Sequence, residues 1–243
     1  MAFLLCVGFC GYGVMRKLRN GVGCPLTGRY ALCVKSKLGG PLSKSSKLAQ
    51  FCSELVGFEI IDRVAGKTYG NMGATIINGI LQSGVKYKTV VAPRVKQYLD
   101  NYPLVKTTSD FLKLLESNEI EDIIEWKPGA KPNRIKKLAN FFQSQSVETE
   151  SDLFLWFQSP ENGSLFLQQD GIGCKTRDYF KILSGHADET AIDRHLYEFI
   201  EMAGIECSGY EEASSIIKGA SKFLNLDVSV LDHSIWYFMS ERA

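Results

Sequence analysis

A lysine that follows a glycine-framed turn is the best candidate for chemistry in this chain. The stretch D-G-I-G-C-K-T (170–176) places Lys175 at the predicted start of a helix. The helix dipole disfavours a cation at that end and should lower the pKa of the amine. A deprotonated lysine amine is a nucleophile that can form a Schiff base. Asp178, three residues further on, could instead pair with Lys175 at the surface, which would raise that pKa.

A carboxylate, Asp193, follows Lys175 by 18 positions and lies near the predicted start of another helix. A carboxylate can stabilise the oxocarbenium-like sugar cation that forms as a glycosidic bond breaks, or help to position the attacking group. An aspartate at this place can also simply cap its helix. Both interpretations of Asp193 stay open from the sequence.

The turn before Lys175 has the pattern of a helix–hairpin–helix. Gly171 and Gly173 allow a sharp turn and a close approach of the backbone, and Ile172 between them should point into the helix pair. The free N–H groups at the start of the second helix suit an anion such as a phosphate. The alternative is an ordinary loop between two core helices.

Helical periodicity extends over most of the chain from about Lys44, and strand-like alternation is scarce. The pattern predicts helices at 46–57, 74–81, 90–99, 111–124, 135–142, 152–157, 165–169, 175–184, 190–203, 210–224 and 228–239. Turns are predicted at 128–132 and 159–164, and helix starts at Thr108–Asp110 and Glu148–Asp152. We therefore expect an all-α protein.

The stretches L-Q-Q-D-G-I-G-C-K-T-R-D-Y and A-I-D-R-H-L resemble the helix–hairpin–helix DNA glycosylase superfamily, which includes endonuclease III-like and 8-oxoguanine glycosylases. The family pattern is approximately L-P-G-V-G-x-K-T-A, with V-D-x-H about eighteen residues after the lysine. The resemblance is strong at 165–196 and extends weakly from about Met72 to the C-terminus. Asp170 stands where the family usually has proline, and the four-cysteine iron–sulfur cluster of endonuclease III-like enzymes is absent.

The resemblance implies two helical subdomains with a cleft between them, and a glycosylase with associated lyase activity. Lys175 would be the nucleophile, assisted by Asp193, and double-stranded DNA with a damaged base would be the substrate of a monomeric enzyme. The residues assigned to DNA binding are Gly171, Ile172, Gly173, Thr176, His195, Gln82, Ser83, Lys131 and Arg134. Gln82 and Ser83 are candidates for the DNA wedge, and Trp236 and Tyr237 for the base pocket.

Several alternatives stay open beside this interpretation. Lys131 and Arg134 belong to a basic run (127–137), and such a run is more often a solvated helix start than a binding patch. Trp236 lies among apolar residues, where core packing is the commoner role. The chain could be a lyase without glycosylase activity, or a non-catalytic DNA-binding protein that retains the fold. The archaeal 8-oxoguanine glycosylases read the base with a terminal lysine, which this sequence lacks, so the damaged base is not assigned.

Charge divides the sequence into two parts. Residues 1–53 contain eight basic and no acidic side chains, which leaves 20 basic and 27 acidic in residues 54–243. We expect a basic, poorly ordered or targeting leader at 1–43 and a glycosylase-like domain at 44–243. The resemblance divides that domain into a barrel subdomain at about 84–195 and a second subdomain from 44–83 plus 196–243.

The seven cysteines and three histidines show no metal-ligand spacing, so we expect neither a metal nor another cofactor. No apolar run reaches the roughly 20 residues that cross a bilayer, so no membrane association is expected. Free thiols favour a reducing, intracellular location in the cytoplasm, nucleoid or nucleus. An organelle is the alternative if the basic leader is a transit segment.

Overall fold

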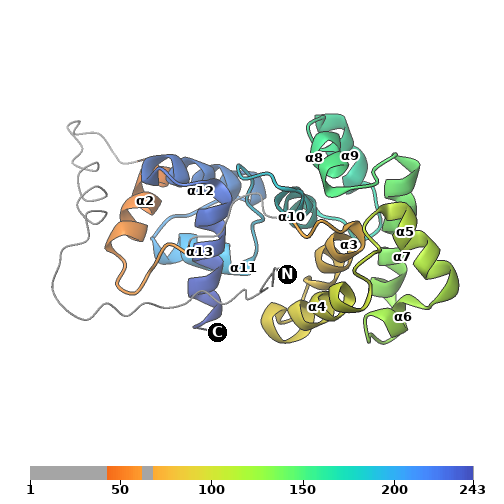
Figure 1. The fold of residues 1–243 in the computed structure, drawn as a ribbon. Helices are drawn as coiled ribbons and strands as arrows, with labels where there is room; N and C mark the ends of the chain where they lie inside the picture. The colour runs from red at the N-terminus through yellow and green to blue at the C-terminus, as the bar shows by residue number, and fades with distance from the viewer. Residues whose placement is uncertain (1–42, 62–67, 243) are drawn as a thin grey trace, which may run out of the picture. The chain divides into compact units, whose positions relative to one another are not determined.

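The computed structural model describes residues 43–61 and 68–242, which form helices and no strand, and this confirms the all-α prediction (Figure 1). The predicted leader lies outside the described residues, apart from Ser43. None of the described helices is both long and apolar enough to span a membrane.

The helices, in chain order, are α2 (Lys44–Glu54), α3 (Met72–Leu81), the π-helical turn η1 (Tyr87–Val91), α4 (Ala92–Asn101), α5 (Thr108–Ser117), α6 (Ile120–Ile123), α7 (Ala130–Ser144), α8 (Glu150–Trp156), α9 (Pro160–Leu167), α10 (Cys174–Ser184), α11 (Arg194–Met202), α12 (Tyr210–Leu224) and α13 (Val228–Ser240).

Side-chain caps determine where two of these helices begin. Thr149 caps α8 and completes a capping box with Asp152, within the predicted start at 148–152. Thr107 caps α5 with Asp110 in the same arrangement, one residue before the predicted cap. A helix start that depends on a local side-chain bond can therefore be found in the sequence to within about one residue.

The turn predicted at 159–164 was wrong, and the turn predicted at 128–132 is confirmed only at residues 128–129, which form a bend before α7. Residues 159–164 form the start of α9, because Pro160 occupies the first helical position, where its missing N–H is not needed. Residues 130–132 form the first turn of α7, which also accepts Pro132. The single helix predicted at 111–124 is two helices, α5 and α6, and the one predicted at 190–203 begins only at Arg194.

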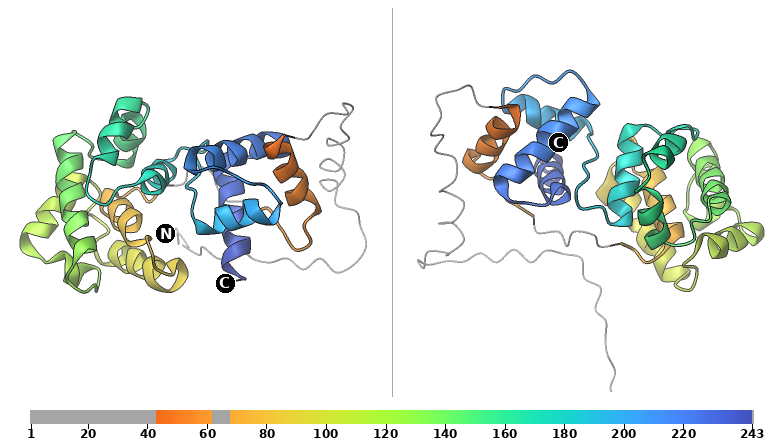
Figure 2. Two further views of the ribbon diagram at one scale, coloured as in Figure 1. Left: turned by 180° about the vertical axis from the view of Figure 1, so that it is seen from behind. Right: turned by 90° about the horizontal axis from the view of Figure 1, so that it is seen from above.

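The buried apolar side chains form two clusters. The first contains residues of α3 to α10, and the second contains residues of α2 and of α11 to α13. Figure 2 shows α2 alongside α12, with which it packs. The predicted subdomain boundary at residue 84 differs from this packing, because α3 belongs to the first cluster and not with α2.

Helix α3 is the centre of the first cluster and is buried along its whole length. It contacts both α7 and α10 (Figure 1). Gly79 allows the contact with α10, since a Cβ at this position would lie 2.3 Å from two ring atoms of Phe180. Because α10 carries Lys175, this close packing places the candidate nucleophile next to the C-terminal end of α3.

Candidate functional site

Lys175 is the second residue of α10 and follows a turn that only glycine can form without strain. Gly171 has a φ of +73°, and a Cβ there would lie 2.2 Å from atoms of the Arg134 guanidinium. Ile172 is buried in the first cluster, as predicted, and Gly173 is the N-cap without a side-chain bond. The N–H groups of the first turn of α10 are thus not capped by a side chain.

The amine of Lys175 lies between two polar side chains from distant parts of the chain. Its Nζ donates a hydrogen bond of 2.7 Å to Oε1 of Gln82, the residue that ends α3. The same Nζ lies 3.8 Å from Oδ2 of Asp193, and the Lys175 side chain is one-third exposed. The structure therefore brings together Lys175 and Asp193, and adds Gln82 as a direct partner of the amine.

Burial lowers the pKa of the Lys175 amine, while the nearby carboxylates of Asp193 and Asp232 oppose this shift. The direction is the one expected from the sequence. The main cause is loss of solvent contact, rather than the helix dipole on which that expectation depended. A lowered pKa increases the fraction of neutral, nucleophilic amine near neutral pH.

Asp193 caps its helix, which is one of the two roles that the sequence left open, and it also faces Lys175. Its Oδ1 accepts hydrogen bonds from the backbone N–H groups of His195 (2.9 Å) and Leu196 (3.2 Å), so it caps α11. Its other oxygen, Oδ2, is the one that faces Lys175. The helix cap thus holds the carboxylate in a fixed orientation toward the amine.

Two buried nitrogen atoms near this pair have no hydrogen-bond partner among the described residues. They are Nε2 of Gln82 and Nδ1 of His195. The His195 ring lies 4.0 Å from a carboxylate oxygen of Glu198. Thr176 is partly exposed beside Lys175.

Asp178 is not a surface partner of Lys175, which corrects one of the two sequence interpretations. Its carboxylate is buried and accepts hydrogen bonds from Nε (2.6 Å) and Nη2 (3.0 Å) of Arg177. The hydroxyl of Tyr210 in α12 donates a third bond of 2.8 Å. Asp178 therefore links α10 to α12, and its hydrogen bonds go to Arg177 and Tyr210 and not to the Lys175 amine.

The basic residues assigned to DNA binding differ in their surroundings. Lys131 donates to the backbone carbonyls of Leu81 (2.7 Å) and Ser83 (2.6 Å), so its charge is directed inward. Arg134 is half-buried against the Gly171 turn and lies 3.7 Å from Asp170. Of the two, Arg134 is thus the one beside the candidate phosphate-binding turn.

The residues assigned to the base pocket lie on α13 and contact η1. Trp236 is half-buried, packs edge-on against Tyr87 with ring centres 5.9 Å apart, and stacks on His233. Tyr237 is exposed and lies under the ammonium of Lys88, 4.5 Å from the ring centre. These contacts fit both open interpretations, a packing role and a role at the rim of a site.

The sequence interpretation missed Asp232, which also lies on α13. Its Oδ2 accepts hydrogen bonds from the hydroxyl of Thr190 (2.6 Å) and the N–H of Ala191 (2.9 Å), in the segment before Asp193. The negative charge of Asp232 is close enough to Lys175 to oppose the lowering of the amine's pKa by burial. No local spacing relates Asp232 to Lys175, because only the packing of α13 brings them close.

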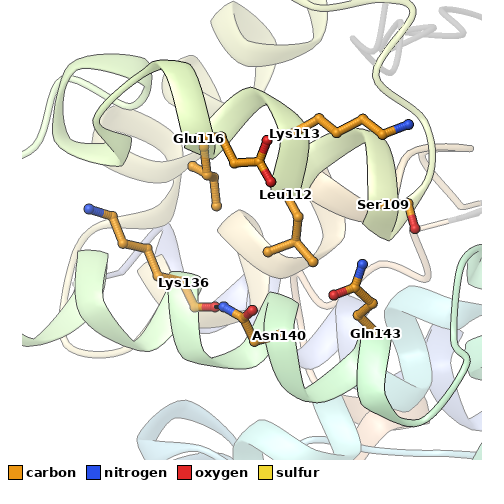
Figure 3. Close-up of a pocket in the computed structure, with 8 residues that line it drawn as sticks. Ser109, Leu112, Lys113, Glu116, Lys136, Asn140 and Gln143 are labelled. Atoms are coloured by element: carbon orange, nitrogen blue, oxygen red, sulfur yellow. Dashed lines mark hydrogen bonds between the residues drawn. The ribbon is translucent and has the colours of Figure 1, made fainter.

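A pocket of about 450 Å³ lies elsewhere, between α5 and α7 (Figure 3). Figure 3 shows Lys113 and Glu116 of α5 opposite Lys136 and Asn140 of α7. None of the candidate site residues lines this pocket, and Lys136 is already paired with Glu119 at 2.7 Å. This pocket is therefore not part of the Lys175 site.

Comparison with known proteins gives one partial likeness. The chain is 34% identical over 76 residues to proteins named 8-oxoguanine DNA glycosylase/AP lyase from Saccharolobus islandicus, in strains L.S.2.15 and M.14.25. The match covers 28% of this chain and 37% of those relatives. No family model and no solved structure matches the chain. The likeness is distant and loosely supports a DNA glycosylase or lyase role.

Proposed function

We propose that this protein is a base-excision DNA glycosylase with associated lyase activity. The observation that carries the proposal is the geometry of the amine. Lys175 has a lowered pKa and lies 3.8 Å from a carboxylate that a helix start holds in place. The partial likeness to named glycosylase/AP lyases supports the same reaction class.

In the proposed reaction, the neutral amine of Lys175 attacks C1′ of the damaged nucleotide, and a C1′–N bond to the enzyme replaces the bond to the base. The base leaves with a proton, and the sugar ring opens to give a Schiff base. Asp193 stabilises the positive charge that develops on the sugar as the base departs. Loss of a C2′ proton then expels the 3′ phosphate and nicks the strand, and hydrolysis of the Schiff base frees Lys175.

The substrate in this proposal is double-stranded DNA from which the damaged base is flipped out of the helix. The uncapped first turn of α10 and the glycine turn before it, which includes Gly171 and Gly173, would hold phosphates beside the lesion. Arg134 adjoins that turn. Trp236 and Tyr237 stay the proposed residues of the base pocket, and the enzyme is proposed to act as a monomer.

Borohydride trapping tests the proposal directly, because it reduces the Schiff base to a stable adduct. The full chain is incubated with duplexes that contain 8-oxoguanine, another oxidised base or an abasic site, and adducts and nicks are separated by gel. We expect an adduct with wild type and none with Lys175→Gln. Lys222→Gln, the same change at an exposed lysine of α12, is the matched control and should trap like wild type.

A DNA-binding protein without catalytic activity is the second candidate, favoured by the uncapped first turn of α10, which suits a phosphate whether or not Lys175 reacts. Enzymes and binding proteins of this kind differ in the trapping experiment. Binding to lesion duplexes without adduct or nick on any of them would favour the binding protein. An adduct with the abasic duplex alone would identify a lyase without glycosylase activity.

A further inference from the structure

The ammonium of Lys131 has an unusual place for a residue of a basic surface run. Its Nζ donates to two backbone carbonyls, those of Leu81 and Ser83, and lies 5.1 Å from the centre of the Trp126 ring. Burial lowers the pKa of Lys131, and the neighbouring Arg134 lowers it further. A lysine whose charge is engaged in this way is poorly placed to meet a DNA phosphate.

The Leu81 carbonyl is the last of α3, and Ser83 directly follows the C-cap, Gln82. The last carbonyls of a helix lack partners within the helix. A cation at this end also interacts favourably with the helix dipole. Helix α3 has no basic residue of its own in its last turn, and Lys131 of α7 fills this place. The two contacts lie on either side of Gln82, so Lys131 fixes the peptide from which the Gln82 side chain projects.

Gln82 in turn contacts the candidate nucleophile. Its Oε1 accepts the 2.7 Å hydrogen bond from Nζ of Lys175. An acceptor at this distance restricts the directions in which the remaining substituents and the lone pair of the amine can point. Since the reacting atoms of a bound substrate must be aligned, a misplacement of about 1 Å can cost on the order of 100-fold in rate.

We propose that Lys131 and Gln82 are positioning residues for Lys175: Lys131 holds the end of α3, and Gln82 orients the amine. The inference rests on the proposed function, since it concerns the amine that would attack the sugar. It replaces, for Lys131, the phosphate contact expected from the sequence. The two roles differ in a measurable way, because a phosphate contact contributes to DNA affinity and its salt dependence.

The test compares Lys131→Met, which keeps the apolar stem but removes the ammonium, with Lys222→Met. Lys222 is an exposed lysine of α12 and lies outside the proposed site. Single-turnover trapping on an abasic duplex and equilibrium binding at two salt concentrations are measured for each. We expect Lys131→Met to slow trapping at least tenfold with little change in affinity, and Lys222→Met to leave the trapping rate unchanged. Weaker, less salt-dependent binding by Lys131→Met at a normal trapping rate would overturn the proposal.

A double-variant comparison shows whether Lys131 acts through Gln82. Gln82→Leu removes the acceptor itself, and circular dichroism checks that each variant is folded. If the two residues act in one chain of contacts, Lys131→Met combined with Gln82→Leu traps no more slowly than Gln82→Leu alone. Rate losses that multiply in the double variant would refute the coupling.

A readout without DNA separates this inference from the proposed function. Acetylation of Lys175 by limiting acetic anhydride, followed by mass spectrometry across a pH series, reports how the amine itself reacts. We expect Lys131→Met to shift the pH profile of Lys175 acetylation and Lys222→Met to leave it unchanged. An unchanged profile in Lys131→Met would overturn the inference, whether or not wild type forms an adduct with DNA.

Discussion

The buried carboxylate of Asp178 supports a quantitative prediction about stability. Its side chain is only 4% exposed and accepts two hydrogen bonds from Arg177 and one from Tyr210. Hydrogen bonds to a charged group contribute about 1.5–3 kcal/mol each, but the three share one acceptor and are not additive. Breaking a buried ion pair by removing one partner costs about 3–5 kcal/mol, because the other charge is left uncompensated.

We therefore expect Asp178→Ala to lower the free energy of unfolding by about 3–5 kcal/mol, a large part of the roughly 5–15 kcal/mol that stabilises a typical domain. Tyr210→Phe removes one donor and leaves the pair with Arg177 intact, so it should cost about 1.5–3 kcal/mol, the value of one hydrogen bond to a charged group. Urea unfolding followed by far-UV circular dichroism measures both values.

Asp100→Asn is the control, because Asp100 pairs with Lys96 on the exposed face of α4. Exposed pairs four residues apart on a helix contribute about 0.3–0.5 kcal/mol, so this variant should unfold nearly like wild type. If Asp178→Ala cost less than about 1 kcal/mol, the buried network would not stabilise the fold as the reasoning requires.

Two further predictions concern the amine and the core. The trapping rate should rise with pH as Lys175 loses its proton. Asp193→Asn should move this rise to lower pH, because the Asp193 charge raises the pKa of Lys175. If the rise in Asp193→Asn came at the same or a higher pH than in wild type, Asp193 would not act on the amine as proposed. Gly79→Ala should destabilise the protein by about 1–3 kcal/mol in the same urea assay, because the alanine Cβ would overlap the ring of Phe180. An unchanged unfolding midpoint would show that α3 and α10 are not closely packed.

The sequence by itself determined those features that depend on neighbouring residues. Helical periodicity predicted an all-α fold, and the Thr149–Asp152 capping box marked the start of α8. The glycine turn before Lys175 was also identifiable, because a φ of +73° at Gly171 favours glycine whatever packs around it. The turn predicted at 159–164 was wrong for a local reason, because Pro160 suits the first turn of a helix as well as it suits a loop.

Only the tertiary structure decided which side chains surround the candidate nucleophile. Gln82 precedes Lys175 by 93 positions and meets it because α3 packs against α10. Asp178, three positions away, faces α12 instead and binds Arg177 and Tyr210. The sequence likewise placed Lys131 in a basic run that binds DNA or faces solvent. In the structure its ammonium instead donates to backbone carbonyls at and just after the end of α3. Side-chain burial and partners depend on helix packing between distant segments, which periodicity and spacing along the chain do not determine.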